Sequence, residues 1–280
     1  IAIQSKGRLY EESMALLEES GIKIPGGKRT LLVPARNFPV EVLFLRDDDI
    51  PESVASGVAD VGIVGLNEVM EKCCPVGILK KLGFGKCRLS LAIPQDIDYQ
   101  DRNWFSGKKI ATSYPGILSD YLHKNGIVSD IHVITGSVEI APGIRLADAI
   151  FDIVSSGSTL VSNRLKEVET VVESEAVLIG TDSISPEKRG ILDELLFRFD
   201  SVQAADDKKY ILMNVPQKKL NDVLSVLPGI KSPTVMPLAD KEWCSVHTVL
   251  DEKCFWEIIN RLKTAGAEGI LVLDIEKMIL

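Results

Sequence analysis

The stretch from Leu146 to Leu160, LADAIFDIVSSGSTL, has the residue types and spacing of a ligand-binding loop. An apolar run that suits a buried strand leads into a loop of small and hydroxyl-bearing residues: Ser155, Ser156, Gly157, Ser158 and Thr159. If a helix begins near Thr159, free backbone N–H groups and the positive end of the helix dipole converge on this loop. The sequence therefore predicts a phosphate site here, with the hydroxyl groups as further donors.

Carboxylates accompany this loop. Asp152 stands at the end of the expected strand, and Glu139 and Asp148 are near it in the sequence. A carboxylate in this position suits the hydroxyls of a ribose or a hydrated magnesium ion. Because Ser and Thr are also the commonest helix-capping residues, an ordinary helix N-cap remains equally open. Composition and spacing alone therefore indicate a protein that binds phosphorylated sugars, and nothing more specific.

Several other kinds of site are not indicated. There is no Gly-Lys-Ser/Thr run and no G-x-G-x-x-G that opens a helix after a strand, which argues against kinase and dehydrogenase functions. A nucleophile elbow is missing, and the three histidines suggest no catalytic triad. The net charge of −8 argues against a nucleic-acid partner, because phosphate backbones need clustered Lys and Arg.

Length and composition favour a globular protein of about two domains, with a third possible, since the chain has 280 residues of which 45% are hydrophobic. Its longest apolar stretches, such as Val61 to Leu66, are strand-sized, so we expect no membrane partner. Five cysteines without zinc-ligand spacing suit a reducing compartment. A short apolar start that precedes Lys6 and Arg8 reverses the order of a secretion signal. We therefore expect a cytoplasmic protein.

The elements around the loop follow an α/β rhythm. We expect a strand over Ile1 to Gln4 and a helix near Leu9 to Ser20, which Gly21 ends in a left-handed conformation. Asp49 and Glu52 have the spacing of a capping box that opens the next helix.

A weak internal repeat suggests two similar lobes. The segments beginning at Lys6-Gly7-Arg8 and at Thr112-Ser113-Tyr114-Pro115 both read as loop, helix, glycine and strand. DVGIVG (60–65) aligns with DIVSSG (152–157), acid first and glycine last. Because α/β sheets bind ligands beyond the carboxyl ends of their strands, two facing lobes predict a cleft lined by these loops. Any single loop, taken alone, is explained as well by a simple turn.

The last part of the chain has a different pattern. A polar linker over 204–209 precedes strand 210–215, helix 220–227, strands 234–238 and 245–250, helix 255–264 and strand 269–275. This βαββαβ order is typical of a ferredoxin-like domain. A small separate domain of this kind suggests regulation or assembly.

Taken together, these segments resemble the ATP phosphoribosyltransferase family in its long form. The motifs that carry the resemblance run in order along the chain: QSKGRL (4–9), RDDDIP (46–51), DVGIVG (60–65), CRLS (87–90), ATSYP (111–115), GSVE (136–139), the 146–160 loop, SPT (232–234) and ILVL (270–273). Their joint occurrence is far more specific than any one motif and covers essentially the whole chain.

The resemblance implies an α/β fold with a two-lobed catalytic core, similar to type II periplasmic binding proteins, and a C-terminal ferredoxin-like (ACT-like) βαββαβ domain. Lobe I would comprise residues 1–88 and 176–200, lobe II residues 89–175, and the regulatory domain residues 201–280. It also implies an activity, transfer of the phosphoribosyl group of phosphoribosyl pyrophosphate to N1 of ATP with Mg²⁺ assistance. Histidine would inhibit, and dimers would assemble into hexamers.

The resemblance further implies roles for individual residues. Asp152 and Glu139 would be catalytic, and Asp152 would be the candidate Mg²⁺ ligand. Phosphoribosyl pyrophosphate would contact Asp148, Asp152, Ser155, Ser156, Gly157, Ser158 and Thr159. ATP would contact Lys6, Gly7, Arg8, Arg46, Asp60, Gly65, Arg88 and Tyr114. The effector would contact Asn214, Ser232 and Thr234.

Other interpretations stay open at this point. Isolated Lys and Arg residues are mostly solvated surface groups, and Tyr114 suits a core position as well as a stacking one. A non-catalytic module that closes two lobes on a small anion shares much of the pattern. A transcription regulator would need a helix-turn-helix and a basic face, which the sequence does not offer.

Overall fold

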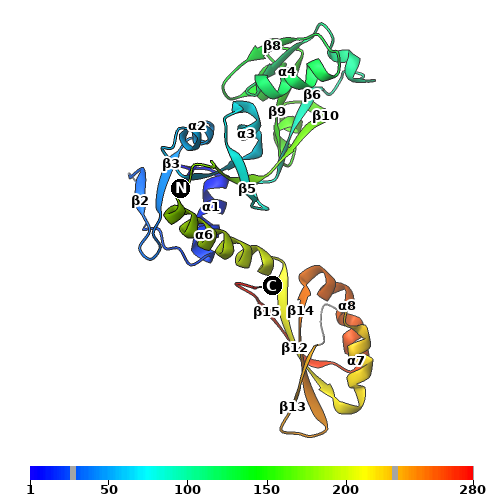
Figure 1. Ribbon diagram of the computed structural model, residues 1–280. Coiled ribbons are helices and arrows are strands. Elements are labelled where there is room, and N and C mark those ends of the chain that lie inside the picture. Colours follow the sequence, from blue (N-terminus) through cyan, green and yellow to red (C-terminus); the bar gives the residue numbers. More distant parts are fainter. Residues whose placement is uncertain (26–29, 229–232, 280) are drawn as a thin grey trace. The chain divides into compact units, whose positions relative to one another are not determined.

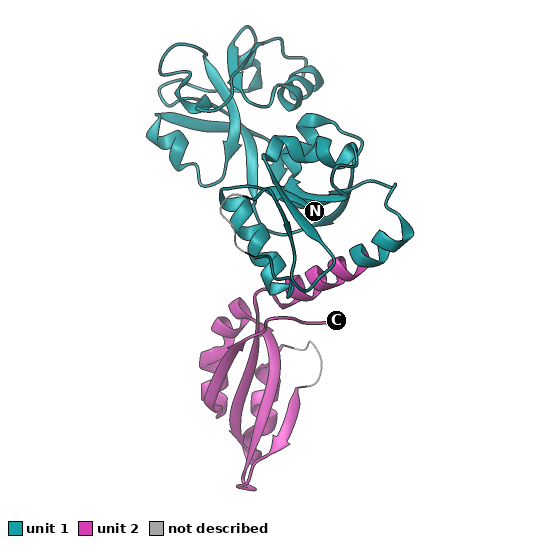
Figure 2. Ribbon diagram, turned by 90° about the vertical axis from the view of Figure 1, so that its left-hand side faces the viewer, with its two compact units in different colours: residues 1–192 teal, residues 193–280 magenta. Residues whose placement is uncertain are grey.

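The computed structural model describes residues 1–25, 30–228 and 233–279. The chain forms two compact units, residues 1–192 and 193–280, and the boundary falls inside helix α6, Pro186–Ala205 (Figure 2). Within the described ranges, no helix is long and apolar enough to cross a membrane.

The first unit begins with lobe I, a mixed sheet in the order β2-β3-β1-β4-β11-β5. Its strands are β1 (Ala2–Gln4), β2 (Leu32–Pro34), β3 (Glu41–Leu45), β4 (Val61–Gly65), β5 (Gly77–Lys81) and β11 (Ala176–Gly180). Helices α1 (Arg8–Glu19), α2 (Ile50–Ala55), α3 (Leu66–Lys72) and the start of α6 belong to this lobe (Figure 1). The central strands β3, β1 and β4 are parallel, so their carboxyl ends meet at one edge.

Burial explains the central strands of lobe I. Val61 to Val64 are buried without alternation, as expected for a parallel strand covered on both faces. Helix α1 ends as predicted, because Gly21 adopts φ 76° and its N–H donates to the Glu18 carbonyl at 2.8 Å. A glycine suits this left-handed position.

The predicted capping box at Asp49 and Glu52 is wrong. The Asp49 side chain makes no cap hydrogen bond. Instead, a short 3-10 helix over Asp47–Asp49 leads directly into α2, and the Ser53 hydroxyl donates to the Asp49 carbonyl at 2.8 Å. The preceding turn therefore starts the helix, and the reciprocal side-chain bonds are not needed.

Lobe II is a second mixed sheet, in the order β10-β6-β9-β7-β8. Its strands are β6 (Cys87–Pro94), β7 (Lys109–Thr112), β8 (Asp130–Val133), β9 (Ala149–Val154) and β10 (Leu165–Ser174), with helices α4 (Pro115–Lys124) and α5 (Ser158–Ser162). Two short 3-10 helices, Arg102–Phe105 and Val138–Ile140, complete it. Fully buried Phe105 and Phe151 anchor its core.

The two lobes share the strand, loop and helix units that the internal repeat predicted. In lobe I, β1 leads to α1 and β4 to α3; in lobe II, β7 leads to α4 and β9 to α5. The alignment of the two acids is wrong, because Asp60 precedes β4 whereas Asp152 lies inside β9. The chain crosses between the lobes after β5 and returns after β10.

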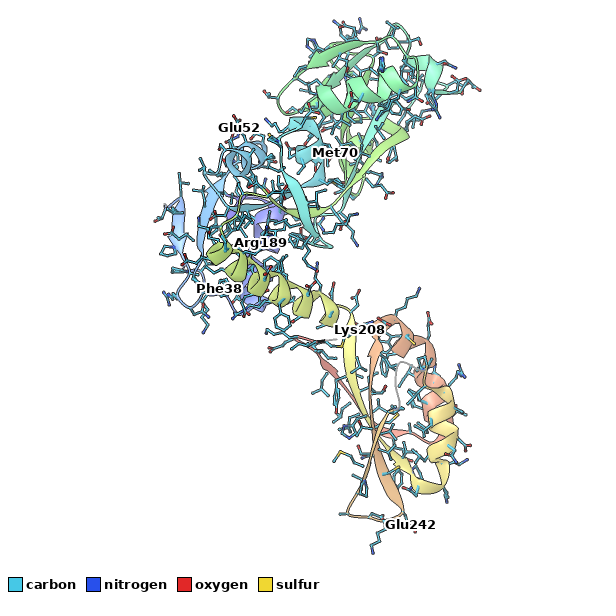
Figure 3. The ribbon with its side chains drawn as sticks, in the orientation of Figure 1. Phe38, Glu52, Met70, Arg189, Lys208 and Glu242 are labelled. Carbon is cyan, nitrogen blue, oxygen red and sulfur yellow. The ribbon has the colours of Figure 1, made fainter. Side chains whose placement is uncertain are left out.

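The second unit has the βαββαβ order predicted from the sequence. Its strands are β12 (Lys208–Pro216), β13 (Thr234–Pro237), β14 (Trp243–Asp251) and β15 (Glu268–Asp274), and its helices are α7 (Leu220–Val226) and α8 (Glu252–Ala265), with a 3-10 turn over Gln217–Lys219. All pairs are antiparallel, in the order β13-β14-β12-β15. Lys208, labelled in Figure 3, pairs with Asp251 across β12 and β14. The predicted α/β class, with a two-lobed core and a ferredoxin-like C-terminal domain, is confirmed.

Candidate active-site cleft

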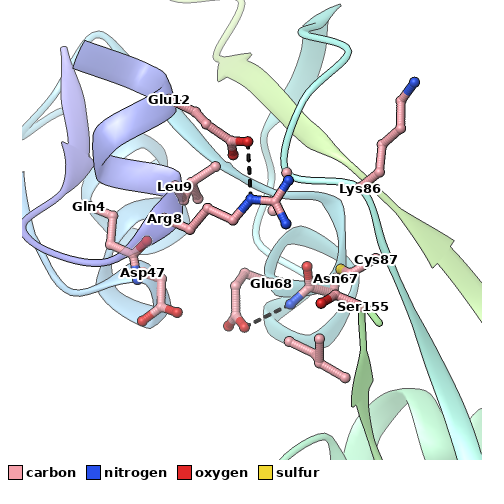
Figure 4. Close-up of a pocket in the computed structure, with 13 residues that line it drawn as sticks. Gln4, Arg8, Leu9, Glu12, Asp47, Asn67, Glu68, Lys86, Cys87 and Ser155 are labelled. Atoms are coloured by element: carbon pink, nitrogen blue, oxygen red, sulfur yellow. Dashed lines mark hydrogen bonds and ion pairs between the residues drawn. The ribbon is translucent and has the colours of Figure 1, made fainter. Parts of the chain in front are cut away.

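Both lobes contribute to a cleft of about 260 Å³ (Figure 4). Most of its lining comes from lobe I, and lobe II contributes residues at the start of β6 and the end of β9. The lining residues are Gln4, Arg8, Leu9, Glu12, Asp47, Gly65, Asn67, Glu68, Gly85, Lys86, Cys87, Ile153 and Ser155. The carboxyl ends of β1, β4 and β9 thus face one space, as expected for an α/β ligand site.

The predicted phosphate loop begins where β9 ends. Gly157 adopts φ 79°, and α5 starts at Ser158, one residue before the expected start. The Ser156 and Ser158 hydroxyls lie 3.0 Å apart, and the side chains of Ser155, Ser156, Ser158 and Thr159 are exposed. Because the first N–H groups of a helix have no partner within it, the loop offers backbone donors beside these hydroxyls. This geometry suits a phosphate group.

Asp152 lies three residues before this loop, inside β9 and partly buried. Burial raises the pKa of its carboxyl to about 6, although the Ile153 N–H donates to Oδ1 at 2.8 Å and favours the charged form. The negative charge of Glu139 also raises this pKa, and Glu139 lies in the 3-10 helix that packs against β9. The two predicted catalytic carboxylates are thus near enough for their charges to interact.

Arg88, predicted to contact ATP, makes its hydrogen bonds within lobe II. Its Nε and Nη2 donate to the two carboxylate oxygens of Glu167 at 2.6 and 2.5 Å, and its Nη1 donates to the Ser155 carbonyl at 3.2 Å. The hydrogen bonds from Arg88 lower the pKa of Glu167 to about 2, and the Ser90 hydroxyl contributes at 2.7 Å. Through its bond to the Ser155 carbonyl, Arg88 holds the phosphate loop against β10.

Two predicted contacts lie at the wrong ends of their strands. Asp148 precedes β9 and accepts a hydrogen bond from the Lys109 N–H at 2.9 Å, at the amino end of the sheet. The length of β9 places it roughly 20 Å from the phosphate loop. Asp60 precedes β4, and its carboxylate accepts bonds from Lys188 at 2.8 and 3.0 Å. Neither lines the cleft, which corrects both assignments.

The structure also corrects the predicted stacking role of Tyr114. Its side chain is 8% exposed and belongs to the core of lobe II. Its hydroxyl donates to Glu68 Oε1 at 2.9 Å, and burial raises the pKa of this phenol far above its usual range, with Glu68 as the next cause. The ring is therefore closed to an adenine, and the hydroxyl instead joins the two lobes.

The remaining predicted nucleotide contacts divide into two groups. Arg8 and Gly65 line the cleft, and Arg8 Nε donates to Glu12 at 3.1 Å. Gly7 adopts φ 92° directly before α1, where a glycine is favoured. Lys6 is exposed, and Arg46 pairs with Asp48 at 3.1 Å. Neither Lys6 nor Arg46 is part of the lining.

Sequence reasoning missed a polar cluster at the start of α3. Asn67 and Glu68 are 5% and 6% exposed, yet both line the cleft. Burial raises the pKa of the Glu68 carboxyl, although the hydrogen bond from Tyr114 opposes the shift. Two polar residues, which follow a buried strand that ends in Gly65 after the single residue Leu66, were the available signal, because buried polar groups need partners. Lys86, just before β6, was also missed.

The described residues contain no group of three or more His, Cys, Asp or Glu side chains that could hold a metal ion. Mg²⁺ is commonly held by one or two carboxylates together with substrate phosphates and water. Asp152, with Glu139 beside it, fits that limited role. The cleft therefore suits a metal that arrives with a phosphorylated ligand.

Two of the predicted effector contacts lie on the sheet of the second unit. Asn214 pairs with Ser245, and Thr234 pairs with His247, so all four share the face opposite the helices. The Ser245 hydroxyl and His247 Nε2, 3.0 Å apart, lie between them. The third predicted contact, Ser232, is outside the described residues.

Comparisons with known proteins agree over the whole chain. A family model described as ATP phosphoribosyltransferase matches residues 46–201, and one described as the C-terminal domain of HisG matches residues 205–277. Curated ATP phosphoribosyltransferases from Bacteroides fragilis and Phocaeicola vulgatus are each 70% identical over 280 residues, covering 100% of this chain and 99% of each relative. A relative of the same name from Cytophaga hutchinsonii is 57% identical over 279 residues, with 98% of its length covered.

A solved structure supports the same relationship. It is the ATP phosphoribosyl transferase (HisG:HisZ) complex from Thermotoga maritima, and the matched chain is 27% identical with a TM-score of 0.61. The match covers 71% of this chain and 96% of that one.

Asp152→Asn tests the environment of the buried carboxyl. Since the folded pKa of about 6 is raised above its ordinary value, the carboxyl stabilises the fold at low pH, and this contribution is lost as pH rises through 6. We expect the melting temperature of Asp152→Asn, relative to the parent, to increase between pH 4 and pH 8 in metal-free buffer. A relative melting temperature that does not change with pH would contradict the burial of a charged group at this position.

Proposed function

We propose, from the premise that this chain belongs to the ATP phosphoribosyltransferase family, that lobe II binds phosphoribosyl pyrophosphate and lobe I binds ATP. The enzyme transfers the phosphoribosyl group to N1 of the adenine of ATP and releases pyrophosphate, the first step of histidine biosynthesis. Family membership excludes the alternative of a non-catalytic anion-binding module. The observation that carries the proposed arrangement is the phosphate loop, whose first residue, Ser155, lines the cleft together with Arg8, while Asp152 precedes the loop in β9.

The phosphate loop and the carboxylates would orient the sugar. The backbone N–H groups at the start of α5 and the hydroxyls of Ser155 to Thr159 bind the 5-phosphate. The carboxylates of Asp152 and Glu139 accept hydrogen bonds from ribose hydroxyls and face the positive charge that develops at the anomeric carbon. Arg88 keeps the loop in place through the Ser155 carbonyl.

On the lobe I side, Arg8 lines the cleft, and its guanidinium suits a phosphate of ATP or the leaving pyrophosphate. Gly65 makes room for the Asn67 side chain at the cleft, because a Cβ there would lie 2.3 Å from Asn67 Oδ1. Holding both substrates in reactive geometry supplies much of the catalysis.

The reaction uses a divalent metal ion, which we propose is Mg²⁺. When bound, it would supply charge neutralisation for the departing pyrophosphate. We propose that Asp152, the partly buried carboxyl three residues before the phosphate loop, contacts it.

We also propose that histidine inhibits the enzyme through the second unit. The open sheet face carries Asn214 and Thr234 with the Ser245–His247 hydrogen bond between them, so donors and acceptors for an amino acid are grouped there. Inhibition requires that histidine bind one arrangement of lobes or subunits better than another. A homo-oligomer, from dimer to hexamer, would provide such arrangements.

All five cysteines are free, which suits a cytoplasmic enzyme.

The first test is the activity of the chain alone. The Thermotoga maritima relative is named as a complex of two proteins, whereas this chain has its own C-terminal domain. We therefore expect the purified chain to form phosphoribosyl-ATP and pyrophosphate from the two substrates with Mg²⁺. Folded protein that is inactive without a partner would refute this expectation.

The second test is Gly157→Val, which places a branched side chain at φ 79° in the phosphate loop. We expect calorimetry to show about tenfold or greater loss of phosphoribosyl pyrophosphate affinity, equivalent to one hydrogen bond to a charged group. ATP binding should change much less. Gly126→Val is the matched control, because Gly126 adopts φ 67° at the end of α4 with open space around it. Equal affinity in both variants would remove the loop from the site.

The third test is Thr234→Ala, which removes one hydroxyl from the open sheet face. We expect the histidine concentration for half-inhibition to rise about two- to tenfold, while uninhibited turnover stays unchanged. Thr264→Ala, on the exposed side of α8, is the control. An unshifted inhibition curve would exclude Thr234 from the effector site, and a parent enzyme insensitive to histidine would defeat the regulatory proposal.

A further inference from the structure

Helix α3 belongs to lobe I, but its side chains bind lobe II. The Glu71 carboxylate accepts hydrogen bonds from two backbone N–H groups at the start of α4: Gly116 N to Oε1 at 2.8 Å, and Ile117 N to Oε2 at 2.9 Å. Both carboxylate oxygens are thus used across the lobe boundary. The contact joins residues 45 and 46 positions apart in the chain.

Two neighbouring contacts reinforce this one. Tyr114 directly precedes α4, and its hydroxyl donates to Glu68 Oε1 at 2.9 Å. Asn67 exchanges two hydrogen bonds with Ser174, the last residue of β10, through its backbone N–H at 3.1 Å and its Oδ1 at 2.8 Å. Three polar residues of α3, Asn67, Glu68 and Glu71, therefore hold three points of lobe II.

The Glu71 contact differs from an ordinary helix cap. The residue at the N-cap position, Tyr114, makes no side-chain cap bond, although a Ser, Thr, Asp or Asn there would cap α4 locally. The acceptor comes instead from the other lobe. Gly116 makes room for it, because a Cβ at that position would lie 3.1 Å from Oε1 and 3.2 Å from Oε2.

The position of α4 links this contact to the phosphate loop. Helix α4 follows β7, and β7 runs parallel to β9 with Thr112 opposite Phe151. The start of α4 and the phosphate loop therefore stand at the same edge of the lobe II sheet. A bond that fixes the start of α4 against α3 also fixes this edge relative to lobe I.

We propose that Glu71 is a positioning residue that sets the separation between the two substrates. The inference rests on the proposed division of substrates between the lobes. During transfer, adenine N1 forms a bond to the anomeric carbon while the bond from that carbon to the pyrophosphate oxygen breaks, and its electron pair leaves with pyrophosphate. Because a displacement of about 1 Å costs roughly a hundredfold in rate, a loosened lobe boundary slows transfer even when each substrate still binds.

The test compares Glu71→Ala and Glu71→Gln with a matched control, Asp101→Ala. Asp101 caps a 3-10 helix within lobe II by accepting from the Asn103 N–H at 2.8 Å, so its loss removes a similar cap without touching lobe I. For each protein, kcat, the KM values, the melting temperature and the dissociation constant of phosphoribosyl pyrophosphate without ATP are measured.

We expect Glu71→Ala to lower kcat about ten- to a hundredfold while phosphoribosyl pyrophosphate affinity without ATP stays at the parent value. Glu71→Gln keeps one acceptor oxygen, so its kcat should lie between those of Glu71→Ala and the parent. If the alanine variant does not fold, the comparison of Glu71→Gln with the parent serves as the test. Asp101→Ala should have a lower melting temperature than the parent but the same kcat.

Two results would overturn the inference. One is a parent-like kcat in folded Glu71→Ala and Glu71→Gln. The other is an affinity for phosphoribosyl pyrophosphate that falls as much as kcat, because Glu71 would then act within one substrate site. An inactive parent enzyme is a separate outcome, which overturns the proposed function and this inference with it.

Discussion

The backbone N–H groups at the start of α5, which have no acceptor within the helix, are the constraint on which the proposed site depends. A helix cannot satisfy its own first donors, and here they open onto a loop of exposed hydroxyls. The left-handed turn at Gly157 brings them together. Arg88 then fixes the loop by bonding the Ser155 carbonyl, while Glu167 fixes Arg88. We propose that a bound phosphate completes this arrangement by accepting hydrogen bonds from these donors.

Two carboxyls beside this loop show how environment divides their roles. Glu167 accepts hydrogen bonds from Arg88, Ser90 and Thr170, which holds its pKa near 2 and makes it a permanent structural anion. Asp152 has no cation paired with it among the described residues, and burial raises its pKa to about 6. When the Asp152 carboxyl is charged, its burial lowers the stability of the folded protein. A bound ligand or metal ion would offset this cost, so the environment suits a carboxylate that binds one.

Local patterns in the sequence predicted the helix start after β9, the Gly21 cap and the βαββαβ unit, because each depends on neighbouring residues. Asp148 and Asp60 were assigned to the site although each precedes its strand, whereas ligands bind beyond the carboxyl ends of the strands. Tyr114 and Glu71 were misread or missed because their partners lie 45 or more positions away. Such pairings arise from the way the two lobes pack, which hydrophobic periodicity does not encode.

The division of substrates between the lobes can be observed directly in a crystal structure of the enzyme with phosphoribosyl pyrophosphate bound. The account predicts the 5-phosphate within hydrogen-bond distance of the backbone N–H groups of Ser158 and Thr159, with the ribose hydroxyls at Asp152. A 5-phosphate bound instead at Arg8 in lobe I, with the α5 loop empty, would contradict it.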